Sequence, residues 1–291
     1  MYLGIGVAIE AEVLHFMATC VEVSNLSVEA LNGFKILENI SLSIDCGDFV
    51  VVSGPSGGGK STLLKVLLGI RDVLENLRVT GDARVLDVDV LKDGFNKLFG
   101  RVGVVLQNPV NQVFSLTVEE EVAFPLENAG LDVGEIRRRV DEALKVMELD
   151  GLRNRFVNTL SMGQIQRVVL ASVIALRPEL LILDEPCSYL DPVTKKRFYE
   201  YVYSYWRDRK ATVVVVEHDL DYVLGFATKL LILNRKVVAY GPPLKVLGET
   251  SVGDYGVKEP IYIKISKQFN KVARNVEESI EYLKSVICRN E

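Results

Sequence analysis

One nine-residue segment restricts the possible folds of this chain more than any other feature. It fits the pattern GxxxxGK[ST] and consists of Gly54, Pro55, Ser56, Gly57, Gly58, Gly59, Lys60, Ser61 and Thr62. An expected buried strand at Phe49–Val52 precedes it, and an expected helix at Ser61–Gly69 follows. Glycines let such a loop wrap its backbone N–H groups around phosphate oxygens, and the helix N-terminus adds positive potential. The segment therefore predicts a loop that binds the phosphates of a nucleotide.

Two side chains of this loop are expected to act directly on a nucleotide. Lys60 would reach the β- and γ-phosphates, and the Ser61 hydroxyl would ligate Mg²⁺. The alternative interpretation, a flexible glycine-rich turn, is disfavoured because the segment lies between a strand and a helix.

A second motif lies far downstream, where the apolar strand Leu180–Leu183 ends in two carboxylates, Asp184 and Glu185. We expect Asp184 to hold Mg²⁺ through coordinated water and Glu185 to polarise the attacking water. Taken alone, two acids at a strand end are more typical of a helix cap or a turn. Together with the phosphate loop, they predict hydrolysis of a nucleoside triphosphate.

Strand and helix patterns alternate along the chain. Strands are also expected at Cys20–Leu26, Ile36–Ile44, Val102–Leu106, Thr212–Val216 and Lys229–Leu233. Helices are expected at Val133–Leu149, Gly163–Leu176, Val193–Asp208 and about Asn275–Cys288. This alternation predicts an α/β fold in which a largely parallel sheet is covered on both faces.

Composition and charge exclude several classes of protein. With 48% hydrophobic and 25% charged residues, the chain is neither disordered nor collagenous nor a coiled coil. A formal net charge of −5 argues against nucleic acid as a partner. The four cysteines lie far apart in the sequence and have no CxxC spacing; they are Cys20, Cys46, Cys187 and Cys288. We therefore expect them to be reduced thiols that form neither a disulfide framework nor a metal site.

No membrane-spanning or secretory segment is expected. The longest uncharged run, Val102–Val118, is shorter than the roughly 20 apolar residues of a spanning helix. The apolar stretch Met1–Ile9 has no basic residue before it and is followed by Glu10, so it does not predict a signal peptide. The sequence leaves open whether translation starts at Met1 or at Met17.

The segment before the acidic motif carries a family resemblance. Leu160 and the four residues after it resemble the LSGGQ signature of ATP-binding cassette (ABC) ATPases; the four are Ser161, Met162, Gly163 and Gln164. In this family the signature offers a helix N-terminus to the ATP bound by a partner subunit. Met162 stands where the family usually has a glycine, which puts the rate of closure or hydrolysis in question. Ser161 also reads as an ordinary helix N-cap, and the two interpretations are compatible.

Other positions match the family in order along the chain. Gln107 matches the Q-loop, which links the metal and the attacking water to a membrane partner, and Asp191 matches the acid of the D-loop. His218, after the strand Thr212–Val216, matches the switch histidine that contacts the γ-phosphate. At the position of the aromatic residue that usually stacks on adenine, this chain has Ala30, and Phe34 is the candidate substitute. Looser base contact, and so broader nucleotide use, is therefore a hypothesis.

The resemblance covers roughly residues 18–248 and implies the P-loop NTPase fold of ABC ATPases. That fold joins a RecA-like core, an antiparallel β subdomain and a helical signature subdomain, here at about 108–176. Residues 1–17 would be an N-terminal extension and 249–291 a C-terminal helical tail. ATP and Mg²⁺ are the implied cofactors. Two subunits of this family sandwich two ATP molecules, so a second ABC ATPase subunit, identical or paralogous, is implied as a partner.

The Q-loop region Val105–Phe124 and the tail segment Gly256–Pro260 are similar to energy-coupling factor (ECF) transporter ATPases of the EcfA and CbiO type. This resemblance implies a peripheral subunit at the cytoplasmic face of the cell membrane that energises an importer for vitamins or for cobalt or nickel ions. Its partners would be a transmembrane coupling protein and a substrate-binding membrane subunit, with the solute unspecified.

Alternatives remain at two levels. Asn111–Phe124 would help to form the groove for a coupling helix, although Glu119–Glu121 also suits a solvated helix start. For the whole chain, the alternative is a soluble ABC-type ATPase that acts as a cytosolic assembly or signalling switch. A nucleic-acid-associated cassette protein is disfavoured because the chain has no coiled-coil insertion, tandem cassette or basic patch.

Overall fold

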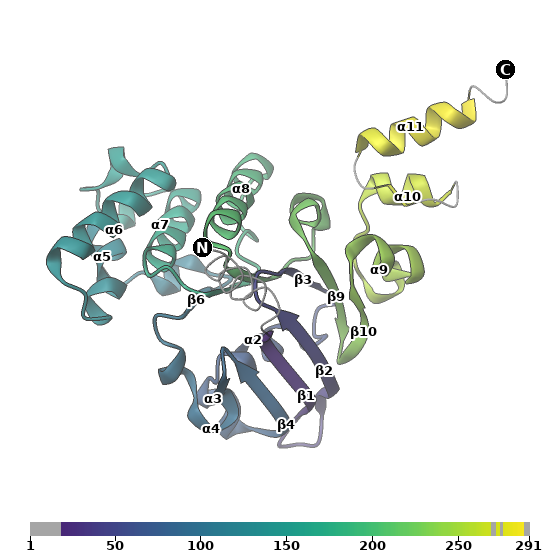
Figure 1. The fold of residues 1–291 in the computed structure, drawn as a ribbon, viewed down its shortest axis with the longest axis horizontal. Helices are drawn as coiled ribbons and strands as arrows, with labels where there is room; N and C mark the ends of the chain where they lie inside the picture. The colour runs from purple at the N-terminus through teal and green to yellow at the C-terminus, as the bar shows by residue number, and fades with distance from the viewer. Residues whose placement is uncertain (1–18, 269–271, 274–275, 288–291) are drawn as a thin grey trace, which may run out of the picture.

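The structure, a computed structural model, contains two β-sheets, one largely parallel and one antiparallel (Figure 1). It describes residues 19–268, 272–273 and 276–287. The larger sheet has the strand order β10-β9-β3-β8-β7-β6. Its parallel strands are β3 (Phe49–Ser53), β6 (Val102–Val105), β7 (Leu180–Asp184), β8 (Thr212–Val216) and β9 (Lys229–Asn234). The edge strand β10 (Lys236–Gly241) runs antiparallel to β9. The predicted α/β fold with a largely parallel sheet is therefore confirmed.

Alternate residues of the central strands belong to two separate hydrophobic cores. Val51 and Val213 pack with residues of the helices α5 (Val118–Asn128), α6 (Val133–Val146), α7 (Met162–Ala175) and α8 (Pro192–Arg209). Their neighbours Val50 and Val214 pack with α2 (Lys60–Leu67) and with the smaller sheet. Because both faces are buried, β3 and β8 each contain a continuous run of apolar residues, Phe49–Val52 and Val213–Val216, rather than an alternating pattern.

The smaller sheet is antiparallel, with the order β2-β1-β4-β5. Its first two strands, β1 (Thr19–Ala30) and β2 (Lys35–Asp45), extend the strands expected at Cys20–Leu26 and Ile36–Ile44. The strands β4 (Leu77–Val85) and β5 (Val88–Asp89) were not predicted. The helices α3 (Arg71–Asn76) and α4 (Val90–Asp93) flank β4 and β5 along the chain.

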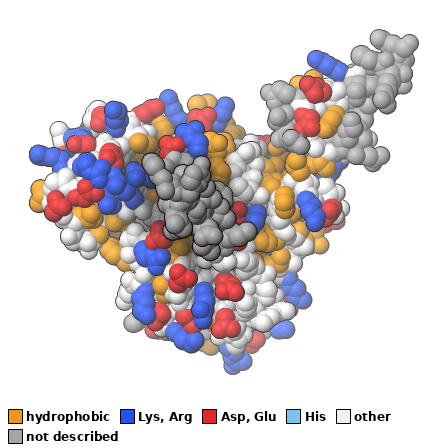
Figure 2. Space-filling view, viewed as in Figure 1, with side chains coloured by type: hydrophobic (Ala, Val, Ile, Leu, Met, Phe, Trp, Pro, Cys, Tyr) orange, Lys and Arg blue, Asp and Glu red, His pale blue; other side chains and the backbone are white. Residues whose placement is uncertain are grey.

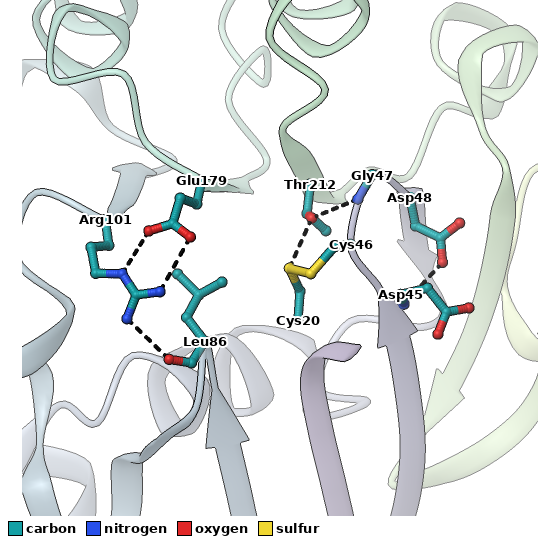
Figure 3. The surroundings of a disulfide bond; sticks show 9 residues. All are labelled: Cys20, Asp45, Cys46, Gly47, Asp48, Leu86, Arg101, Glu179 and Thr212. Carbon is teal, nitrogen blue, oxygen red and sulfur yellow. Dashed lines mark hydrogen bonds and ion pairs between the residues drawn. A yellow bond between two sulfur atoms is a disulfide. The ribbon is translucent and has the colours of Figure 1, made fainter. Parts of the chain in front are cut away.

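The expectation of four reduced thiols is wrong for two of them. Cys20 in β1 and Cys46 directly after β2 form a disulfide (Figure 3). The antiparallel pairing of β1 with β2 brings these two positions together although 26 residues separate them in sequence. Cys187 is a free thiol, as expected, and burial raises its pKa well above the usual value. Cys288 lies outside the described residues.

Two braces join the sheets near this disulfide (Figure 3). At the start of β8, the Thr212 hydroxyl accepts a hydrogen bond from Gly47 N at 3.0 Å and donates to the sulfur of Cys20 at 3.3 Å. The Arg101 guanidinium pairs with Glu179 at 2.6 Å and donates to the Leu86 carbonyl at 3.0 Å. These two sets of hydrogen bonds thus connect the amino-terminal ends of β7 and β8 in the parallel sheet to the antiparallel sheet.

Six of the helices lie in two groups beyond opposite edges of the larger sheet (Figure 1, and Figure 2 in the same view). On one side lie α5, α6 and α7, each of which begins at a side-chain cap; the caps are Thr117, Asp132 and Ser161. On the other side, beyond β9 and β10, lie α9 (Pro243–Glu249), α10 (Ile261–Lys267) and α11 (Val276–Ile287), of which only α11 was predicted. Among the described residues, no helix is both long and apolar enough to cross a bilayer. Residues 1–17, with both candidate start positions, lie outside the described residues.

Candidate nucleotide site

The phosphate loop has a backbone that only glycine can adopt at two of its positions. Gly54 and Gly59 have φ angles of 146° and 92°. A Cβ on Gly54 would lie 2.0 Å from the Leu233 carbonyl oxygen, and a Cβ on Gly59 would lie 2.5 Å from Leu37. The turn between β9 and β10 adds a hydrogen bond from Arg235 N to Gly58 O at 2.8 Å. Neighbouring strands therefore hold the loop open from two sides.

Lys60 begins α2 and points back into the loop. Its ammonium donates to the carbonyl oxygens of Gly54 and Pro55, both at 2.9 Å. Burial lowers the pKa of Lys60, while the nearby charges of Glu185 and Asp184 act in the opposite direction. The cation is thus partly stripped of water and held in the loop, where phosphate oxygens could replace the two carbonyls.

Asp184 and Ser61 meet at the end of β7. The Ser61 hydroxyl donates to the Asp184 carboxylate at 3.2 Å. Burial raises the pKa of Asp184 and Glu185 raises it further, whereas the Ser61 hydrogen bond lowers it. A hydroxyl and a partly buried carboxylate are oxygen ligands of the kind that Mg²⁺ prefers. The residues present therefore fit the expected ion.

Glu185 lies between the other two predicted catalytic residues. Gln107 Nε2 donates to one carboxylate oxygen of Glu185 at 2.9 Å, and His218 Nε2 lies 3.0 Å from the other. The three residues follow β7, β6 and β8, so they meet at the carboxyl edge of the parallel sheet. Glu185 has a φ of +46°, an unusual value for a residue with a side chain. The structure thus brings together the three residues that the sequence singled out.

A cavity of about 380 Å³ opens over the phosphate loop. It is lined by residues 56–62, by Glu185 and His218, and by Phe34 and Ile36 from the start of the β hairpin. Ala30 is not part of the lining. Phe34 is half exposed, and the Arg235 guanidinium lies 4.7 Å from the centre of its ring. An aromatic face is therefore available in the cavity, supplied by Phe34.

Sequence reasoning missed Glu217, which holds the backbone of the switch histidine. Its side chain is buried and accepts hydrogen bonds from His218 N at 2.9 Å and Asp219 N at 3.1 Å. From α8, Lys195 pairs with the same carboxylate at 3.1 Å, and the Tyr199 hydroxyl donates to it at 2.5 Å. An acidic residue directly before His218 could have indicated this role. The partners that explain its burial, Lys195 and Tyr199, come from a helix distant in the sequence.

The signature residues lie apart from the chain's own phosphate loop. Ser161 caps α7, and it exchanges hydrogen bonds with Gln164 in a capping box at 2.9 and 3.3 Å. Gly163 packs so closely on Thr194 that an added Cβ would lie 2.9 Å from its methyl group, and Met162 is partly exposed. None of these residues lines the cavity over the loop.

Asp191, the expected acid of the D-loop, caps the N-terminus of α8. Its carboxylate accepts from Val193 N at 3.0 Å and from Thr194 N at 3.1 Å. Its position places the start of α8 beside Gly163, because Thr194 contacts that glycine.

Comparison with known proteins decides the family. A family model described as ABC transporter matches residues 37–188, which is just over half of the chain. The chain belongs to the ABC transporter ATPases. The ATPase is therefore an ATP-binding transporter subunit and an ATP hydrolase, as predicted.

Named relatives agree with this assignment. The ATPase is 34% identical over 254 residues to energy-coupling factor transporter ATP-binding protein EcfA1 of Mycoplasmopsis synoviae, covering 87% of this chain and 93% of the relative. It is 35% identical to a putative ABC transporter ATP-binding protein of Pyrococcus abyssi, covering 86% and 91%. A further relative of Methanosarcina mazei is 35% identical over 236 residues, but the ATPase spans only 40% of its length.

Two experimental structures resemble the ATPase. One is cbiO1 from Clostridium perfringens, described as part of the ABC transporter complex cbiONQ, with a TM-score of 0.72, 31% identity and coverage of 80% of this chain and 92% of that one. The other is the ATP-binding cassette MJ0796, a dimer in a post-hydrolysis state bound to ADP and Pi, with a TM-score of 0.66, 29% identity and coverage of 77% and 98%. They confirm the predicted ABC ATPase fold.

Proposed function

We propose that this ATPase hydrolyses MgATP between two cassette subunits and thereby energises an ECF-type importer at the cytoplasmic face of the cell membrane. The observation that carries the catalytic part is the position of Glu185, held by Gln107 and His218 at the wall of the phosphate-loop cavity.

The chemistry follows from the residues of the site. Lys60 exchanges its two carbonyl partners for oxygens of the β- and γ-phosphates, and the loop N–H groups complete the cradle. Ser61, Asp184 and Gln107 would hold Mg²⁺, and the ion would neutralise charge on the phosphate oxygens. Glu185 orients and polarises the attacking water, while Gln107 and His218 fix its carboxylate.

The second cassette subunit, a copy or a paralogue, supplies the signature. Because Ser161, Met162, Gly163 and Gln164 lie outside the cavity of their own chain, they are free to face the γ-phosphate of a partner. The Ser161 hydroxyl and the N-terminus of α7 suit that anion. In this arrangement residues 18–248 form the nucleotide-binding domain, with 108–176 as the signature subdomain, 1–17 as an extension and 249–291 as a tail.

An apolar groove near the Q-loop supports a membrane partner. A hollow of about 230 Å³ is lined mainly by apolar residues; they include Val110, Val113, Leu116, Phe156 and Ile165. Phe114 and Leu116 are 74% and 71% exposed, unusual values for such large apolar side chains. An amphipathic helix from a transmembrane coupling protein would cover these side chains.

The groove is mechanically connected to the catalytic residues. Gln112 accepts from Leu106 N at 2.6 Å and donates to Val104 O at 3.0 Å, so it ties the groove segment to β6 directly before Gln107. Buried Glu121 accepts from the backbone N–H groups of Phe114 and Ser115 at 2.9 and 2.8 Å. A movement of the groove would therefore reach Gln107, and through it Glu185.

In this proposal, the specificity for the transported solute lies in another polypeptide. The sequence resemblance to ECF-type ATPases implies vitamins or cobalt or nickel ions, delivered by a substrate-binding membrane subunit. Similarity to EcfA1 and to cbiO1 supports the class of transporter and leaves the solute as a prediction. The alternative function, a soluble assembly or signalling switch, would use the same catalytic residues but would leave the groove without a helix to bind.

The test is to tag the chain, solubilise membranes of its own cells gently, and identify the proteins that co-purify. Polytopic membrane subunits are the expected result, and a small substrate-binding subunit among them would indicate the solute. Phe114→Asp should release these subunits while ATP binding remains. Val133→Asp, which places the same charge on another highly exposed apolar side chain away from the groove, is the matched control. Recovery with soluble proteins alone would contradict the importer and favour the switch.

A further inference from the structure

The C-terminal tail contacts the catalytic half of the molecule at two loops. After α9 the chain makes a short helical turn at Val252–Tyr255, and Gly256 then adopts a φ of +68° that turns the backbone inward. A Cβ placed on Gly256 would lie 3.7 Å from the Cα of Pro55, so the backbone of the tail lies beside the phosphate loop at this glycine.

Two residues later the tail joins the loop of the switch histidine. Lys258 forms an isolated parallel β-bridge with Asp219, the residue directly after His218. The Lys258 ammonium also lies 3.6 Å from the Asp219 carboxylate, which is partly buried. The intervening residue, Val257, is buried in the same core as Leu220. The segment Gly256–Lys258 therefore spans from the phosphate loop to the switch-histidine loop.

The switch-histidine loop is thus held from both sides. Glu217 fixes the backbone N–H groups of His218 and Asp219 from the interior. From the surface, Lys258 fixes Asp219, whose own carboxylate accepts from Asp221 N at 3.4 Å. Each contact restricts the backbone on which the His218 ring approaches Glu185 at 3.0 Å.

We propose that Gly256–Lys258 is a tail strap that positions His218 for hydrolysis, with Lys258 as a positioning residue. The inference rests on the proposed ATP hydrolysis and extends it to a segment beyond the cassette. Because Lys258 lies outside the nucleotide cavity, it acts through Asp219 and contributes no atom to the reaction.

The test compares the full-length chain with Lys258→Asp, Asp219→Lys and the exchanged pair Asp219→Lys/Lys258→Asp. Lys264→Asp makes the same charge change at an exposed position of α10 and is the control. We expect Lys258→Asp to lower kcat for ATP about fivefold, the upper range for an exposed ion pair, with KM and melting temperature close to those of the control. In the exchanged pair, the fold-decrease in kcat should be smaller than the product of the fold-decreases of the two single variants, by a factor of about three or more.

Three results would overturn the strap. Lys258→Asp could match Lys264→Asp in kcat, or the exchanged pair could lose as much as the product of the single variants. Equal falls in melting temperature and in ATP affinity would assign Lys258 a stabilising role only, and would also refute the proposal. If the wild-type chain has no ATPase activity that Glu185→Gln removes, the proposed hydrolysis itself fails, so the two failures can be told apart.

Discussion

The disulfide between Cys20 and Cys46 should contribute a measurable share of the folding stability. The two residues are 26 apart in sequence, and the bond closes that loop in the unfolded chain as well. In the chain-entropy model, a loop of this length lowers the entropy of the unfolded state by about 12 cal/mol/K, or about 3.5 kcal/mol at 25 °C. For a chain of this length, roughly 2 °C per kcal/mol predicts a melting temperature about 7 °C higher than in the reduced protein.

The assay compares one preparation before and after reduction, which avoids changing any side chain. Chemical denaturation with and without a phosphine reductant gives the difference in unfolding free energy, and thermal melts give the shift in melting temperature. Thiol titration of the denatured chain should find two fewer thiols before reduction than after it. Cys46→Ser is the control, because its stability should not respond to the reductant.

Two outcomes would refute this reasoning. If the oxidised and reduced chains unfold within about 0.5 kcal/mol of each other, the loop is already restricted in the unfolded state and the entropy argument fails. If thiol titration finds no difference, the bond does not form, and the original expectation of reduced thiols holds for Cys20 and Cys46.

The remaining predictions concern the nucleotide site. Glu185→Gln should keep ATP binding, abolish turnover and trap a closed dimer on size-exclusion chromatography; turnover at the wild-type rate would assign the water to another residue. Asp184→Asn should raise the melting temperature of the nucleotide-free chain at neutral pH, because burial raises the pKa of Asp184 and disfavours its charged form. That gain should shrink as the pH falls and vanish below about pH 3, where the carboxyl is neutral in both the folded and the unfolded state, and Mg²⁺-dependent stabilisation by ATP should be lost at all pH values; an unchanged melting temperature at pH 7 contradicts the argument. Ser161→Arg should remove a cap worth about 1 kcal/mol and block the partner's site, so ATPase activity falls while ATP still binds; retained activity argues against a shared site. Phe34→Ala should weaken ATP and GTP binding alike, by about fivefold, since stacking tolerates any base; a strong preference of the wild-type chain for ATP would exclude this loose contact.

Much of the candidate site could be predicted because its residues lie at strand ends. Gln107, Asp184 and His218 lie at or just beyond the ends of three mostly apolar strands, and parallel strands bring their carboxyl ends to one edge. The phosphate loop could be recognised equally well, because few other structures require glycines and a lysine at this fixed spacing. Local patterns thus determined which side chains meet.

Features that depend on distant pairing could not be predicted in the same way. The strand Leu77–Val85 is mostly exposed and contains Gly81, so its own sequence has little strand character, and it is held by its ladder with β1. Glu217 needs Lys195 and Tyr199 from α8 to explain its burial. The disulfide was missed because sequence distance was read as spatial distance, although the hairpin of β1 and β2 returns the chain to its starting point.

The left-handed backbone conformation of Glu185 determines which substitutions at this position would stabilise the fold. A residue with a side chain in that conformation costs about 1–3 kcal/mol, which glycine would avoid and asparagine would reduce. A screen for heat resistance alone would therefore enrich glycine or asparagine at position 185 and discard the carboxylate. Robustness and turnover make opposite demands on this one site, so the most durable versions of the chain would be the inactive ones.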